Sequence, residues 1–288
     1  MIRFETIADL VQLATEEASP ISEIVLRSEA EISRQSRFAV MAAMGENWRV
    51  MKEAIERGVE NRERSLSGLT GGDAEKLFAR RNKGYLGAAA LATAAYAVGV
   101  SEVNAAMGRI VACPTAGSCG IVPAALYTAM KQGKSEEAII QSLFTAAGIG
   151  MVIEANASIA GATGGCQAEC GSAAGMAAAA LTELGGGDPE TVSHAAALAI
   201  KNLLGLVCDP VAGLVEVPCV KRNGFAAVHA MLAADMALAG VRSVIPADEV
   251  IEAMERIGRA LPRTLKETAE GGLAMTTTAQ KITQKLYG

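Results

Sequence analysis

The six cysteines of this chain are the residues whose type and spacing best suit chemistry. They fall in three pairs, each in a glycine- or proline-rich segment or where such a segment meets a helical pattern: Cys113 and Cys119, Cys166 and Cys170, Cys208 and Cys219. In a reducing compartment, thiols serve metal binding or catalysis more often than disulfides. A single buried cysteine commonly packs as a small apolar side chain. The evidence for a metal or catalytic site is therefore that the cysteines occur in pairs, rather than that there are six of them.

The spacing of the cysteines limits which metal group they could bind. No Cys-x-x-Cys of a zinc ribbon occurs, and the two histidines, His194 and His229, lie in apolar helical patterns where packing is their ordinary role. A site rich in cysteine and poor in histidine points to iron and sulfur. The interval between Cys208 and Cys219 is not that of a ferredoxin, which disfavours simple electron transfer.

Cys166 is placed to become a thiolate. It follows Gly161, Gly164 and Gly165 and opens the next predicted helix. A thiol at a helix N-terminus is shifted toward the thiolate, the form that binds metals. Cys170 follows one turn later on the same face, so the pair could also act as a redox sensor.

Two further glycine-containing segments, 61–73 and 111–122, lead into predicted helices. Unpaired amides and the positive end of the helix dipole at such a junction suit an anion such as a carboxylate. Purely structural loops share this pattern, so it is weak support by itself.

The elements that position these segments are predicted to be helices. Hydrophobic residues make up 51% of the chain but aromatic residues only 3%, so alanine and small aliphatic side chains dominate, which favours close-packed helices. No alternating strand pattern or fixed-period repeat occurs. We predict an all-α fold, one compact multi-helix domain over 1–288 with 1–60 packed on it, and glycine-rich loops gathered at helix ends around a cluster site.

Caps and breakers predict the helix bounds. Pro210 and Pro218 predict that 205–223 is irregular. The predicted helices are 6–17, one or two within 21–60, 85–98, 102–110, 135–156, 166–184, 188–204, 225–239, 247–260 and a short one from about 278.

Charge and hydropathy suggest where the protein works. The net charge of −5 gives no basic footprint for a nucleic acid or an anionic membrane. The first residues lack the pattern of a secretory signal, and the longest uncharged runs contain prolines or are mostly alanine and glycine, unlike a membrane span. We therefore expect a cytoplasmic protein with no nucleic-acid or membrane partner.

Four motifs in a fixed order make the sequence recognisable. They are Ser-Gly-Leu-Thr-Gly-Gly-Asp at 67–73, Pro-Thr-Ala-Gly at 114–117, Gly-Cys-Gln-Ala-Glu at 165–169 and the stretch from Cys208 to Cys219. Together they resemble the α chain of bacterial iron-sulfur-dependent L-serine dehydratase. The resemblance extends from about residue 60 to the end, and 261–268 and 271–273 also fit.

The resemblance implies conversion of L-serine to pyruvate and ammonia without pyridoxal phosphate. It implies a 4Fe-4S cluster bound by Cys166, Cys208 and Cys219, with one iron left free to act as a Lewis acid on the serine hydroxyl. Cys170 matches no ligand and is predicted to be a core thiol. Candidate residues for binding the substrate carboxylate are Ser67, Thr70, Gly71, Gly72, Thr115, Ala116 and Gly117, with Lys76 and Asn223 assisting.

No residue of the chain is a convincing general base. The length matches an α chain alone, so we expect a β chain to supply the base and to dock on a concave surface formed by the loops around the cysteines. Two alternatives remain open. One is a helical scaffold that holds zinc or an inert cluster, and the other is a redox sensor acting through Cys166 and Cys170.

Overall fold

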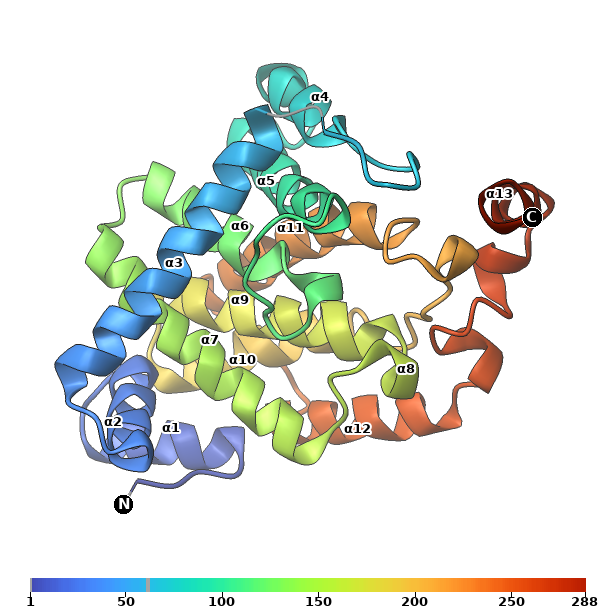
Figure 1. Ribbon diagram of the computed structural model, residues 1–288. Coiled ribbons are helices and arrows are strands. Elements are labelled where there is room, and N and C mark those ends of the chain that lie inside the picture. Colours follow the sequence, from blue (N-terminus) through green and yellow to red (C-terminus); the bar gives the residue numbers. More distant parts are fainter. Residues whose placement is uncertain (1, 61–62) are drawn as a thin grey trace.

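The computed structural model describes residues 2–60 and 63–288, and over this part of the chain it is all-helical, as predicted (Figure 1). Its only β feature there is an isolated bridge between Cys208 and Lys266. The predicted loop from Asn61 begins outside the described residues. The α-helices are α1 (Ile7–Glu16), α2 (Ile21–Ser33), α3 (Arg37–Glu60), α4 (Asp73–Arg80), α5 (Gly87–Ala105), α6 (Ile121–Lys131), α7 (Glu136–Asn156), α8 (Gly161–Gly164), α9 (Ser172–Leu184), α10 (Pro189–Lys201), α11 (Cys219–Leu238), α12 (Ala247–Ala260) and α13 (Thr277–Tyr287).

Several helices begin where their sequence signals predict. Thr6 and Asp9 form a capping box on α1, in which each side chain accepts a hydrogen bond from the other residue's backbone amide. Ser135 caps α7, and Asp188 accepts from the Thr191 amide at 2.8 Å with a proline at the next position. These caps satisfy amides that have no partner within their own helix.

Helix α9 lies at the centre of the fold, between α7, α10, α11 and α6 (Figure 1). Its alanines at 173, 174 and 177–180 are fully buried. A side chain on Gly175 would meet Ile200 of α10 at 2.8 Å, so the two helices can approach this closely only at a glycine. The alanine-rich composition therefore produces a tightly packed helical centre.

Helix α7 is long and apolar enough to cross a membrane by length and composition. More than half of its apolar window is buried within the protein, where α7 packs on α2 and α9. A core helix passes the same test.

The N-terminal helices share the apolar core of the remainder. Trp48 of α3 is fully buried beside Tyr127 of α6, with 6.5 Å between ring centroids. Gly58 of α3 meets Gly99 of α5 so closely that a Cβ on Gly58 would lie 2.4 Å from the Gly99 carbonyl carbon.

Two predicted boundaries are wrong. The helices predicted at 85–98 and 102–110 are the single helix α5, since Gly99 between them lies inside the helix where it packs on α3. Helix α11 begins at Cys219 rather than at 225, so the end of the segment predicted to be irregular is helical. Pro218 occupies the position just before the first turn, where the missing amide of proline costs no hydrogen bond.

Candidate metal centre

Two of the predicted segments bring three cysteines together. Cys166 follows α8, Cys208 lies in the loop after α10, and Cys219 is the first residue of α11. Their exposed fractions are only 2%, 2% and 5%. The Cys166 thiol interacts with those of Cys208 and Cys219 and also with that of Cys170. The structure therefore gathers four sulfurs, three of which are the predicted ligands.

Backbone contacts hold Cys166 in place. Gly165 has a φ of +77°, and a Cβ there would lie 2.9 Å from the Leu206 carbonyl oxygen, so the position requires glycine. The Gln167 amide donates to the same carbonyl at 3.0 Å, and its side chain accepts from the Gly205 amide at 2.9 Å. These bonds join the loop that carries Cys166 to the loop that leads to Cys208.

Cys208 is fixed from the opposite side by the segment after α12. Its amide donates to the Leu265 carbonyl at 2.9 Å, and its carbonyl accepts from the Glu267 amide at 2.8 Å. This segment belongs to the 261–268 stretch that fitted the resemblance. Its role here is to hold the backbone of a predicted ligand.

A buried carboxylate completes the group. The sulfurs of Cys166 and Cys208 and a carboxylate oxygen of Glu169 all lie within 4.8 Å of one another, an arrangement that could hold a metal ion. Thr115 donates to Glu169 at 2.7 Å. A Cβ on Gly117 or Gly161 would lie 2.8 or 2.6 Å from a Glu169 oxygen, so both glycines make room for this carboxylate. Burial raises the pKa of Glu169 to about 7, and the charge of Cys166 adds to the rise.

The thiols share negative charge among themselves. Hydrogen bonding from Cys170, Cys208 and Cys219 lowers the pKa of Cys166 well below that of a free thiol. Hydrogen bonding to Cys166, together with burial, raises the pKa of Cys208 and of Cys219 far above the usual value. The site thus favours a thiolate at Cys166, as metal binding requires.

A buried ion pair supports the same loop. Arg222 donates to Asp209 at 2.9 Å and to the Val207 carbonyl at 2.8 Å, so it contacts the chain on both sides of Cys208. Asp209 also accepts from the Leu273 amide at 2.8 Å. Burial lowers the pKa of Arg222, but the charges of Cys166 and Asp209 outweigh this and raise it overall. A cation therefore stands beside the sulfurs.

The first predicted substrate loop binds Glu216, a residue of the segment between Cys208 and Cys219. Ser67 donates to this buried carboxylate at 2.8 Å. The first amides of α4 are already satisfied, because the buried carboxylate of Glu102 accepts from Asp73 at 2.9 Å and Ala74 at 3.3 Å. The other predicted members of this loop are placed as follows: Thr70 is buried 3.4 Å from the Lys221 ammonium, Gly71 and Gly72 have positive φ, and Lys76 is exposed and paired with Asp73.

The second predicted loop lies directly beside the site. Thr115 contacts Glu169, Ala116 is exposed, and the Gly117 carbonyl accepts from Asn223 at 2.8 Å. Asn223 is fully buried and also accepts from the Gly120 amide at 3.0 Å, so it joins this loop to α11.

Cys113 and Cys119, at the ends of the second loop, are core residues. Both are buried, and burial raises the pKa of Cys119 to about 12. They are therefore unreactive thiols.

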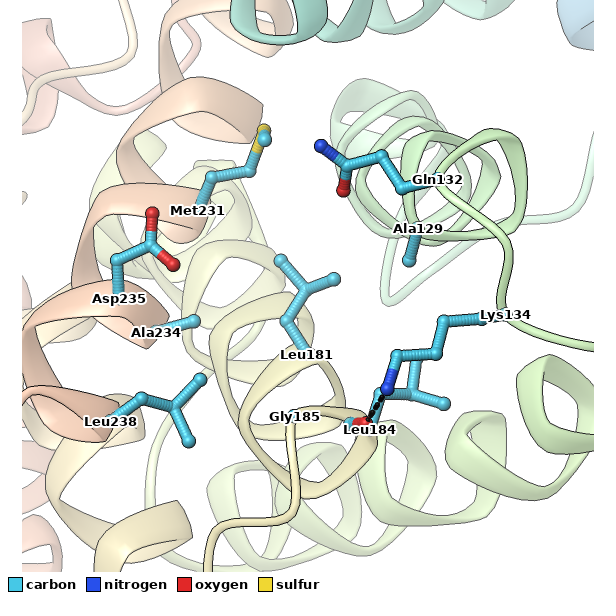
Figure 2. Close-up of a pocket in the computed structure, with 10 residues that line it drawn as sticks. All are labelled: Ala129, Gln132, Lys134, Leu181, Leu184, Gly185, Met231, Ala234, Asp235 and Leu238. Carbon is cyan, nitrogen blue, oxygen red and sulfur yellow. Dashed lines mark hydrogen bonds between the residues drawn. The ribbon is translucent and has the colours of Figure 1, made fainter.

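A separate hollow of about 210 Å³ lies where α6, α9 and α11 end (Figure 2). Its polar side chains are Gln132, Lys134 and Asp235, and Lys134 donates to the Leu184 carbonyl. No cysteine lines it. We assign it no role in the chemistry of the thiols.

The sequence of this chain is similar to those of known proteins. Residues 16–274 match the serine dehydratase alpha chain family. This chain belongs to that family. It is 49% identical over 288 residues to a probable L-serine dehydratase alpha chain of Bacillus subtilis, covering 99% of this chain and 96% of the relative. It is 42% identical over 280 residues to the L-serine dehydratase alpha chain of Peptoniphilus asaccharolyticus, covering 96% of each. It is also 42% identical over 282 residues to the L-serine dehydratase of Streptomyces coelicolor, covering 94% of this chain but only 61% of that longer protein.

Sequence reasoning missed the charged residues that lie beside the thiols or bind the segments carrying them. Glu169, Asp209 and Glu216 all lie inside the motifs used for recognition, and Arg222 follows closely. An acidic residue in an otherwise small and apolar motif was the available signal. The role of such an acidic residue depends on which hydrogen-bond donors and charges the folded chain places beside it.

Proposed function

We propose that this chain is the α chain of an enzyme that deaminates L-serine to pyruvate and ammonia. Membership of the serine dehydratase alpha chain family and the names of the relatives support this activity. The observation that carries the proposal is the convergence of Cys166, Cys208 and Glu169 within 4.8 Å in a chain of this family.

We propose that Cys166, Cys208 and Cys219 hold a 4Fe-4S cluster. The donor set fits such a group, because it consists of soft, nearly fully buried thiols from two separate segments, with a low pKa at Cys166 and a guanidinium alongside. When bound, the cluster supplies a Lewis-acidic iron that makes the serine hydroxyl a better leaving group.

The chain's own residues would orient the substrate around that centre. Thr115 and Glu169 form a hydrogen-bonded pair directly beside the sulfurs, which suits the polar groups of serine. The Ala116 and Gly117 amides follow in the same loop and are predicted donors for the carboxylate. Burial of this region keeps the electrostatic interactions strong.

We propose that a β chain completes the enzyme. The relatives named alpha chain support a second subunit, and the Streptomyces relative contains additional sequence that this chain does not match. The β chain would supply the base that removes the Cα proton. We also propose that 1–288 form one domain and that the enzyme works in the cytoplasm, without a nucleic-acid or membrane partner.

Anaerobic purification and a pyruvate assay test this function. We expect a brown, cluster-loaded protein whose visible absorbance bleaches in air, and pyruvate formation from L-serine when the β chain is co-expressed. A colourless, zinc-loaded chain would instead support the scaffold. Full turnover by this chain with no second polypeptide would refute the shared site.

A further inference from the structure

An apolar groove of about 480 Å³ runs between α4, α5 and α11. Its floor lies where α5 and α11 cross: a Cβ on Gly224 would be 3.0 Å from a Val98 methyl carbon and 3.2 Å from the Ala94 carbonyl oxygen. The absence of a side chain at Gly224 lets the helices approach and leaves larger residues as walls. The lining residues are Leu77, Leu86, Leu91, Ala94, Val98, Lys221, Gly224, Phe225 and Val228.

The walls of this groove expose large apolar side chains. Phe225 is 81% exposed and Leu86 is 59% exposed, and Tyr85 next to it is fully exposed. Along α11, Val228 and the exposed Leu232 follow Phe225 at helical spacing, so the apolar stripe continues beyond the groove. Single exposed apolar residues are ordinary on a protein surface, but a contiguous set around a groove indicates a binding surface.

The rim is basic in an otherwise acidic protein. Helix α4 and the turn Arg81–Lys83 carry four basic and two acidic side chains, whereas the whole chain has a net charge of −5. Arg80 and Lys83 are exposed, whereas Lys76 and Lys221, which lines the groove, share the Asp73 carboxylate at 2.8 and 2.7 Å. An apolar floor with a basic rim suits an amphipathic helix flanked by acidic residues.

We propose that this groove docks an amphipathic, acidic-flanked segment of the β chain, an inference that rests on the proposed function. Two observations select this occupant. The longer Streptomyces relative contains sequence beyond the 61% that this chain matches, and a β chain that corresponds to this sequence would dock on the α chain. The groove also lies on the helix that begins with a predicted ligand, because Lys221, which lines it, is two residues after Cys219 on α11, and its ammonium is 3.4 Å from the Thr70 hydroxyl.

This position would seat the β chain beside the loops that surround the thiols. Ser67 in the same loop as Thr70 donates to Glu216, which lies between Cys208 and Cys219. A segment bound in the groove would therefore bring the rest of the β chain to the predicted substrate loops. The docking surface predicted from the sequence extends, on this proposal, from the site loops onto α4, α5 and α11.

The test measures the dissociation constant of the purified β chain for the full-length, cluster-loaded chain by titration calorimetry. Phe225→Ser and Leu86→Ser are each expected to weaken binding roughly thirtyfold, which corresponds to about 2 kcal/mol at an apolar anchor. The matched control is Phe38→Ser on α3, because Phe38 is 83% exposed and does not line the groove. That control should bind as wild type, and circular dichroism melts should coincide for all variants.

The outcomes separate this inference from the proposed function. Equal binding by wild type, Phe225→Ser and Leu86→Ser would overturn the docking site while pyruvate formation by the wild-type complex still stood. A wild-type chain that fails to bind the β chain would overturn it too. So would self-association of this chain that Phe225→Ser abolishes, since a second copy would then be the occupant. If both variants bind more weakly but the wild-type complex forms no pyruvate, the docking site is supported and the proposed activity is refuted.

Discussion

The ion pair behind Cys208 gives the sharpest stability prediction. Arg222 and Asp209 have side-chain exposures of only 17% and 5%, and the guanidinium makes bonds of 2.9 and 2.8 Å. Arg222→Met keeps most of the aliphatic packing but leaves the Asp209 carboxylate buried with the Leu273 amide as its remaining donor. Breaking a buried pair in this way costs about 3–5 kcal/mol. Because Arg222 retains some exposure, we expect a loss near the lower end, about 3 kcal/mol.

The measurement is urea unfolding of the metal-free chain, followed by circular dichroism. Adding Asp209→Asn to Arg222→Met removes the uncompensated charge and should recover about 1–2 kcal/mol. Arg256→Met is the matched control, because Arg256 and its partner Glu252 are both 65% exposed, and it should cost about 0.5 kcal/mol or less. If Arg222→Met costs no more than this control, or if the double variant is no more stable than the single one, the pair does not support the loop as argued.

Two further predictions follow from the site and from the start of α4. Cys208→Ser should abolish iron binding and activity, whereas Cys170→Ser should keep the iron, as measured by iron content and visible absorbance; loss of the cluster in Cys170→Ser alone would show that the choice of three ligands is wrong. Burial raises the pKa of Glu102, so the folded state holds this proton more tightly than the unfolded state, and the free energy of unfolding should fall as pH rises from about 4.5 through the raised pKa. Glu102→Gln should flatten that part of the stability profile in urea unfolding, and an unchanged slope would contradict the assignment.

The sequence alone determined the helical architecture and the segments that carry the thiols. Caps such as Thr6, Ser135 and Asp188 act within one turn, so their effect can be read from neighbouring residues. Cys166 and Cys208 stand out for the same reason, since glycine and proline change the local backbone whatever surrounds them. The four motifs also sufficed to recognise the family.

Only the tertiary structure decided which groups face the thiols. Thr115 and Glu169 are 54 residues apart, and Arg222 and Asp209 are 13 apart, so no local pattern reveals either contact. The same holds for Glu102, which lies 29 residues from the amide that it satisfies at the start of α4. Packing decided the helix bounds as well, because a glycine that could have ended α5 instead lies against α3. A charged residue's role in this protein depends on long-range partners and burial, which arise only when the helices pack.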